Sequence, residues 1–442
     1  MRKKLFYFKP DTDIFEIGQY CFYIGTLFLS TTLFISGIFY LISLFISFTQ
    51  KSLNFSNRKW NKLLLLSLIL LFTSSTFVYF TNDWSLLYEN ILEIKKWDRN
   101  LVWFNLIHWF LMFLGFAGFQ RYLSSENQRI NAAKFLFIGT IPIIISCFMQ
   151  RILGIYGPFE FMNGLIVFYL KPITSDVGVT GIFNNPNYTG IWLSSILPFS
   201  FFILKSNRLK FFSLVFLSLS LLSSVYIICD TYSRNSFIGI FIAASIMFGT
   251  KALILGLIAL VLIYIILLGF SPLEFLSKTS IEILPEKIFQ RLFETNYFNK
   301  FQNPRIDIWG KAIKLILERP LLGWGAASFP ILFLLSGGIS DAQHTHNLFL
   351  EIAQINGLPV AITLTLFVSL LIYKTYKTVF QENNPKEIDK AWLASSLIII
   401  FSHLTDVTYY EGRVSLLIWV FLSGLNCIID SAEENNLNKK NV

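Results

Sequence analysis

The feature that most constrains this chain is the recurrence, from one end to the other, of apolar runs long enough to cross a bilayer. A membrane-spanning helix needs about 20 mostly apolar residues, because the hydrocarbon core is about 30 Å thick. Charged residues make up only 14% of the chain, whereas a soluble domain has about 25%. The sequence therefore predicts an all-α integral membrane protein. The apolar runs lie near residues 62–80, 101–119, 131–149, 188–204, 211–229, 235–249, 251–270, 352–373, 391–408 and 413–430.

An earlier apolar stretch, residues 17–48, is too long for one span and short for two. The charges on its flanks distinguish one crossing from two, because Lys and Arg are enriched on the cytoplasmic side of a membrane. Both flanks are basic, so we expect the stretch to cross twice, with a tight turn near Ser30–Thr32. The flanking cations are Arg2, Lys3, Lys4 and Lys9 before the stretch and Lys51, Arg58, Lys59 and Lys62 after it.

Together these runs predict about 12 transmembrane helices with both termini in the cytoplasm. The enrichment of Lys and Arg on the cytoplasmic side also accounts for the net charge of +9. This charge therefore does not indicate nucleic-acid binding. We divide the chain into N-terminal helices (1–150), central helices (151–270), a large periplasmic loop (271–345) and C-terminal helices (346–442). The loop contains "NPRIDIWGKAIKLILERP", which predicts an amphipathic helix capped by Asn303. Its expected apolar stripe is Trp309, Ala312, Ile313, Ile316 and Leu317.

Four polar motifs fall on the non-cytoplasmic face of this topology: "GIFNNPN", "DTYSRNS", "NPRIDIWGKAIKLILERPLLGWG" and "HTHN". Each leads into a predicted helix, and helix N-termini carry free N–H groups and partial positive charge that suit phosphate. Arg234 and Arg305 lie at such helix starts, where a cation is unfavourable unless an anion binds as well. The alternative is an interfacial Arg that pairs with a nearby acid such as Asp230 or Asp307.

Two of the four histidines, His344 and His346, flank a single Thr, and three interpretations of them are open. Zinc would need a third ligand, and no second cluster of ligands is visible in the sequence; the four cysteines are scattered singly. The histidines could instead cap a helix start. A His at a helix N-terminus also tends to stay neutral, the form that accepts a proton in general base catalysis.

The segments "GIFNNPNYTG", "TYSRNSFIGI", "RIDIWGKAIKLILERPLLGWGAASF" and "HTHNLFLEIAQINGLP" occur in the order seen in the O-antigen ligase/polymerase family, which the chain resembles over residues 180–373. The resemblance implies a glycosyltransferase of the GT-C type, acting at the periplasmic face of the bacterial inner (plasma) membrane without metal or other cofactor. Its partners would be an undecaprenyl diphosphate-linked glycan donor, membrane lipids and an acceptor hydroxyl on lipid A-core or another glycan.

The resemblance also implies roles for individual residues. His346 matches the His of the family's His-Asn pair and would be the catalytic base, which predicts inversion at the anomeric carbon. Arg234 and Arg305 match the two family arginines that would bind the substrate diphosphate. His344 matches a second His found in many members and is a secondary candidate.

One departure from the family concerns the stretch before "GIFNNPN". Many relatives have a basic residue there, whereas this chain has "VGVT". Part of the diphosphate site could then come from Arg151 or Lys171. Asn187 is a further secondary candidate, expected to shape the start of its helix rather than to react.

Rival functions remain open at this stage. A polymerase would extend a carrier-linked glycan, and a protein O-oligosaccharyltransferase would use a protein side chain as acceptor. From another class, a small-solute transporter, for example of bicarbonate, fits the topology. The apolar runs hold few charged residues, however, and the distinctive polar groups gather on one face rather than at the bilayer midplane, which argues against transport.

Overall fold

The computed structural model describes residues 10–49, 59–81, 97–174, 177–205, 210–249, 304–338, 342–381 and 385–440, with isolated positions at 251, 254 and 258. Most of the predicted span 251–270 and all of the loop residues 271–303, including the predicted cap Asn303, lie outside the described residues. The helices are α1 (Pro10–Phe28), α2 (Leu33–Thr49), α3 (Lys59–Thr81), α4 (Leu101–Phe119), α5 (Glu126–Ile152), α6 (Pro186–Leu204), α7 (Phe211–Asp230), α8 (Arg234–Phe248), α12 (Pro304–Glu318), α13 (Phe329–Leu335), α14 (Leu348–Asn356), α15 (Leu358–Gln381), α16 (Glu387–Ser402) and α17 (Gly412–Lys440).

Within the described ranges, 7 helices are long and apolar enough to cross a membrane. They correspond to α3, α4, α5, α6, α7, α15 and α17, and two shorter apolar helices are α2 and α8. The strands β1 (Phe159–Phe161) and β2 (Ile166–Phe168) form a single antiparallel hairpin between α5 and α6. An all-α membrane protein is therefore confirmed for this part of the chain, while the count of about 12 spans stays a prediction.

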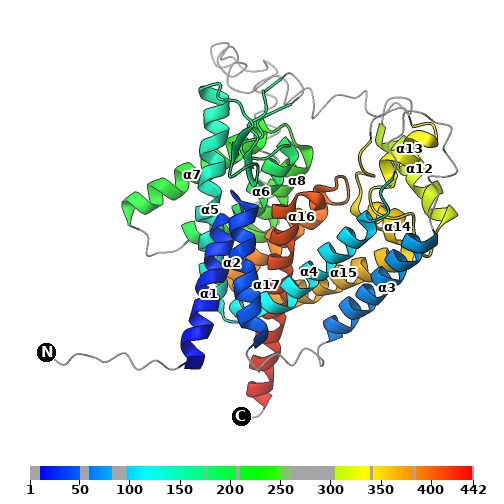
Figure 1. Ribbon diagram of the computed structural model, residues 1–442. Coiled ribbons are helices and arrows are strands. Elements are labelled where there is room, and N and C mark those ends of the chain that lie inside the picture. The colour runs from blue at the N-terminus through cyan, green and yellow to red at the C-terminus, as the bar shows by residue number, and fades with distance from the viewer. Residues whose placement is uncertain are drawn as a thin grey trace.

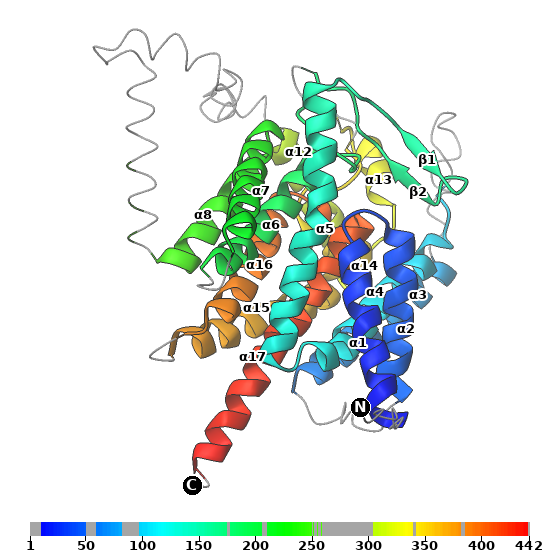
Figure 2. The same cartoon turned by 90° about the vertical axis from the view of Figure 1, so that its left-hand side faces the viewer.

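The helical hairpin expected in the first apolar stretch is present. Helix α1 ends at Phe28 and α2 begins at Leu33. The amide of Thr32 donates to the carbonyl of Phe28 at 2.9 Å, and the Ser36 hydroxyl donates to the carbonyl of Gly25 at 2.8 Å. The start of α1 and the end of α17 lie at one end of the molecule, whereas α12, α13 and the β-hairpin lie toward the other (Figures 1 and 2).

The predicted span 352–373 is wrong at its start, because the helix is broken at Gly357. This residue has φ +90°, and a Cβ built on it would lie 2.2 Å from the carbonyl oxygen of Leu321. A turn in "PLLGWG" fills the break: the amides of Trp324 and Gly325 donate to the carbonyls of Gln354 and Ile355, each at 2.9 Å. These donors satisfy the last carbonyls of α14, which have no partner within their own helix.

The predicted span 391–408 also ends too late. Helix α16 stops at Ser402, and residues 403–411 form a loop that contains the short 3-10 helix η5 (Thr408–Tyr410). A buried carboxylate needs hydrogen-bond donors, which the interior of an apolar helix cannot supply. In the loop, the carboxylate of Asp406 accepts a hydrogen bond from the amide of Val407 at 2.9 Å. The loop thus places an acidic side chain where donors surround it.

The amphipathic helix expected in the large loop is α12, but its buried stripe differs from the prediction. Ala312 and Ile316 are buried as expected, whereas Ile313 and Leu317 are 47% and 69% exposed. The buried face of α12 packs into a small core with Trp97, Phe329 and Phe333. Helix α12 therefore has a second apolar face, and this face is largely exposed in the described part of the chain.

Candidate functional site

The His-Thr-His turn before α14 is built around Thr345, which is fully buried. Its amide donates to Oε2 of Glu351 at 2.8 Å, and its carbonyl accepts a hydrogen bond from the indole of Trp309 at 2.9 Å. Glu351 is itself buried and accepts a hydrogen bond from the hydroxyl of Tyr410 at 3.2 Å. These contacts attach the turn to α12 on one side and to the 403–411 loop on the other.

The capping role proposed for the histidines belongs instead to Asn347. Its side chain accepts a hydrogen bond from the amide of Leu350 at 3.0 Å, the usual arrangement of an Asn N-cap. The side-chain nitrogen Nδ2 of Asn347 also donates to the carbonyl of Leu404 at 3.0 Å, and the backbone amide of Leu348 donates to the carbonyl of His403 at 2.9 Å. The start of α14 is therefore hydrogen-bonded to the 403–411 loop, and both histidines are left for other contacts.

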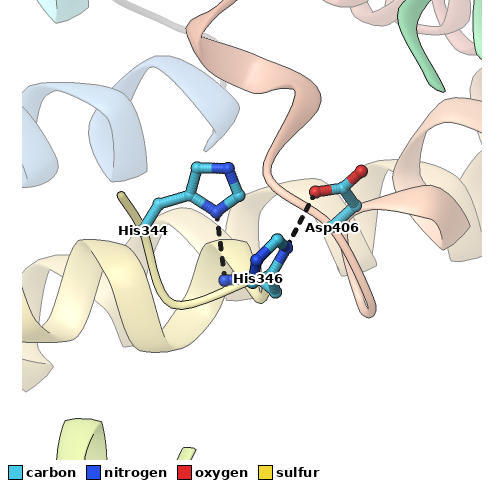
Figure 3. Close-up of side chains that lie close together, drawn as sticks. All are labelled: His344, His346 and Asp406. Atoms are coloured by element: carbon cyan, nitrogen blue, oxygen red, sulfur yellow. Dashed lines mark hydrogen bonds and ion pairs between the residues drawn. The ribbon is translucent and has the colours of Figure 1, made fainter. Parts of the chain in front are cut away.

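The rings of His344 and His346 lie with their centroids 4.3 Å apart (Figure 3). Nδ1 of His344 accepts a hydrogen bond from the amide of His346 at 3.3 Å. Burial, together with the charges of His346 and Arg305, lowers the pKa of His344 to about 4, so that this ring is neutral near pH 7 and can serve as acceptor. His346 has φ +53°, a conformation that costs a non-Gly residue about 1–3 kcal/mol and gathers at functional sites.

Nδ1 of His346 lies 3.2 Å from Oδ1 of Asp406 (Figure 3). The side chain of His346 is 32% exposed, whereas that of Asp406 is 6% exposed. Burial alone would raise the pKa of Asp406, but the hydrogen bond from His346, the electrostatic interactions with both histidines and the amide of Val407 hold it below its usual range. An ionised Asp406 can only accept a hydrogen bond, so it favours the tautomer of His346 with the proton on Nδ1 and the lone pair on Nε2.

Asn187 is the third member of this group. Its side-chain amide donates to Oδ2 of Asp406 at 2.8 Å, so the two carboxylate oxygens face His346 and Asn187 separately. Asn187 lies in the first turn of α6, whose N-cap Asn185 accepts a hydrogen bond from its backbone amide at 2.9 Å. The secondary candidate from the "FNNPN" motif is thus connected to His346 through one carboxylate.

The two predicted diphosphate ligands begin helices that border this group. Arg234 is the first residue of α8, and the next residue, Asn235, accepts a hydrogen bond from the hydroxyl of Thr405 at 2.6 Å. Arg305 lies one turn before Trp309 in α12, and its charge contributes to the low pKa of His344. The structure thus brings the helix starts that carry both arginines to the two chain segments that carry the histidines and Asp406.

Arg151, the other secondary candidate, binds Asp230. Its Nε donates to Oδ2 of Asp230 at 2.6 Å, and a terminal guanidinium nitrogen donates to Oδ1. Asp230 is 3% exposed, so this carboxylate neutralises Arg151 in a partly buried setting. Asp230, named at first as a partner for Arg234, is therefore engaged by Arg151 at the end of α7.

The structure adds a third candidate metal ligand to the two histidines. The third ligand that the sequence did not show is present in Asp406: one ligand atom each from His344, His346 and Asp406 lie within 4.8 Å of one another. Two His and one carboxylate are a chemically suitable donor set for zinc. In this structure, however, Nδ1 of His344 and Nδ1 of His346 are both in hydrogen bonds within the cluster. Metal-free action therefore stays a prediction.

Asp406 and Glu351 were not identified from the sequence. Asp406 lies inside an apolar run that was assigned to a span, and an acidic residue there is a functional signal that could have singled it out. Glu351 follows "HTHN" by four residues on α14, and nothing in its sequence context distinguishes a buried acid from an exposed one.

Residues 216–365 match a family model described as O-Antigen ligase. The matched range contains Arg234, Arg305, His344 and His346, and it ends after the helix break at Gly357. Asn187 and Asp406 lie outside it. A search of curated proteins found no match to the chain.

Proposed function

We propose that this chain, whose residues 216–365 match the O-antigen ligase family model, is an O-antigen ligase-like enzyme that transfers a glycan from undecaprenyl diphosphate to an acceptor hydroxyl. The proposed acceptor is lipid A-core or a similar glycan, at the periplasmic face of a bacterial inner membrane. The family supports a membrane glycosyltransferase that uses a lipid-linked glycan. The donor, the acceptor and the mechanism are our inference from the site.

The observation that carries the proposal is the Asn187–Asp406–His346 arrangement. Asp406 holds the proton on Nδ1 of His346, so Nε2 can take the proton from an incoming hydroxyl. The acceptor oxygen attacks the anomeric carbon as the bond between that carbon and the diphosphate oxygen breaks. The proton goes to His346, the electron pair leaves with the diphosphate, and a single displacement inverts the anomeric centre.

The leaving group must be stabilised as its negative charge grows. We assign this role to Arg234 and Arg305, each at the start of a helix whose N-terminal amides favour an anion. Arginine suits a diphosphate because its planar guanidinium offers paired donors. This reaction balances without a metal. Because His344, His346 and Asp406 could bind zinc, the test of the proposed function includes metal removal.

The test is transfer by the purified protein in vesicles, with a lipid-linked oligosaccharide as donor and lipid A-core as acceptor. We expect one glycan joined per acceptor, with inverted configuration at the new bond, and the same rate after treatment with EDTA. Growth of carrier-linked chains would show a polymerase, and glycan on protein side chains would show a protein glycosyltransferase. Solute flux without transfer would contradict the enzyme assignment, and loss of activity restored only by zinc would contradict metal independence.

A further inference from the structure

Helix α12 has two exposed faces of opposite character. Ile306, Ile313 and Leu317 are 51%, 47% and 69% exposed. At 3.6 residues per turn these three side chains fall within about 40° of one another on the helix. Lys314 and Glu318, also exposed, lie on a separate face about 90° away. The apolar face is therefore a continuous stripe rather than scattered exposed residues, and we call it the α12 stripe.

The stripe is not the face by which α12 packs on the protein. That face contains Ile308, Ala312 and Leu315, which are buried in the core with Trp97, Phe329 and Phe333. Helix α12 thus has three faces: one is buried against the protein, one is polar and exposed, and one is apolar and exposed. This pattern is typical of a helix at a membrane surface.

The chain directly after α12 is hydrogen-bonded to a candidate span. The carbonyl of Leu322 accepts a hydrogen bond from the hydroxyl of Ser74 at 2.7 Å. Ser74 lies in the candidate span α3, seven residues before the end at Thr81, or about 10 Å along the helix axis. The turn after α12 thus lies at the depth of a membrane-spanning helix, and its Leu321 side chain is 68% exposed there.

Helix α3 has exposed apolar side chains of its own, among them Phe77, which follows Ser74 by three residues and is 48% exposed. The described residues include seven candidate spans, and apolar side chains exposed on a spanning helix contact lipid. Leu321 lies between the α12 stripe and α3, since it follows the end of α12 by three residues and its neighbour Leu322 is hydrogen-bonded to α3.

We propose that α12 lies in the surface of the bilayer, with Ile306, Ile313, Leu317 and Leu321 in contact with lipid acyl chains. The occupant of this apolar face is the membrane itself. Lys314 and Glu318 face the aqueous side. On the proposed function, this depth holds Arg305, at the start of α12, near the lipid headgroups where the diphosphate of a polyprenyl carrier lies. The lipid contact does not depend on that role.

The experiment measures the surroundings of nitroxide labels in the full-length protein, reconstituted in phosphatidylethanolamine–phosphatidylglycerol vesicles. Cys21 and Cys229, the two cysteines that are not buried, are first replaced by Ser. Labels are attached at Ile313→Cys and Leu317→Cys, and the matched controls are their sequence neighbours Lys314→Cys and Glu318→Cys. Collision rates with oxygen, which concentrates in lipid, and with a nickel chelate, which stays in water, are then compared.

We expect the ratio of oxygen to nickel collisions to be several-fold higher at positions 313 and 317 than at 314 and 318. Equal ratios at all four positions would overturn the proposal, because the stripe would then face water. Shielding of 313 and 317 from both reagents would overturn it in favour of a protein partner or a second copy. Ile306→Cys replaces any labelled variant that fails to elute as a single species. No glycan transfer is needed, so failure here is distinct from failure of the proposed function.

Discussion

Nδ1 of His346 lies 3.2 Å from Oδ1 of Asp406, although 60 residues separate the two in the sequence. The other oxygen of the same carboxylate accepts a hydrogen bond from Asn187 at 2.8 Å, across 219 residues. A single buried carboxylate therefore connects two of the motifs, "HTHN" and "FNNPN". Its geometry defines which nitrogen of His346 can act as a base.

Replacing Asp406 by Asn should lower kcat for glycan transfer by about 10²-fold or more. Asp406 receives donors on both oxygens, from Asn187 and from Val407 and His346. An Asn side chain is neutral, and in either orientation its NH₂ group meets another donor, so it should hold the proton on Nδ1 of His346 less strongly than the carboxylate does. Turnover of the purified variant checks this. A folded Asp406→Asn protein with wild-type kcat would remove the carboxylate from the mechanism.

Replacing Asn187 by Ala should act on turnover rather than on stability. A hydrogen bond to a charged group contributes about 1.5–3 kcal/mol, which corresponds to about 10- to 100-fold in kcat if it is needed to orient Asp406. The control is Asn185→Ala, which removes the N-cap of the same helix and should cost about 1 kcal/mol of stability with a smaller effect on kcat. Equal losses of kcat in the two variants would show that Asn187 serves only the start of α6.

His344 should make the protein sensitive to acid. Its pKa is about 4 in the folded protein and about 6.5 in an unfolded chain. Between these values the unfolded chain binds one more proton, so stability falls as the pH drops from about 6.5 to about 4. His344→Gln keeps an acceptor for the amide of His346 but cannot titrate. The wild-type Tm should therefore fall further than that of the variant between pH 7 and pH 5. Parallel decreases in Tm would contradict a low pKa for His344.

The helix break at Gly357 should tolerate no side chain. Gly357→Ala puts a methyl group 2.2 Å from the carbonyl oxygen of Leu321 in a residue with φ +90°, so we expect a loss of at least about 2 kcal/mol. In Gly310→Ala, the control on α12, the new methyl meets nothing within 4 Å, and the change should stabilise the helix by about 0.5–1 kcal/mol. Thermal unfolding in detergent compares the two. A Gly357→Ala protein as stable as the wild type would show that the "PLLGWG" turn does not need close contact with α14.

Local patterns predicted much of this fold, because hydrophobic length and the placement of Lys and Arg are properties of short segments. The turn between α1 and α2 and most of the long helices follow from them. The break at Gly357 does not follow from hydropathy, since residues 352–373 are apolar throughout; the sequence "NGLP" was the turn signal that could have revealed it. Because residues 391–408 form a mostly apolar run, the predicted span extended beyond Ser402. The loop that contains Asp406 was therefore not predicted.

The candidate site could be predicted only in part, for a related reason. His346, Arg234 and Arg305 lie in short motifs at helix starts, and their positions in the sequence single them out. The partner of His346 depends on how α16 and α17 return beside α14, which no local pattern encodes. The role of Asn187 has the same origin, because its hydrogen bond to Asp406 exists only once α6 and the 403–411 loop have packed together.

In the proposed mechanism, His346 removes the proton from the acceptor hydroxyl. The most direct test of this step is single-turnover transfer by His346→Ala in vesicles, with saturating lipid-linked donor and acceptor, using protein whose elution and Tm match the wild type. We predict that the rate of transfer falls by about 10²–10⁴-fold while the donor still binds, because Arg234 and Arg305 are unchanged. Transfer at the wild-type rate by a folded His346→Ala protein would contradict the account.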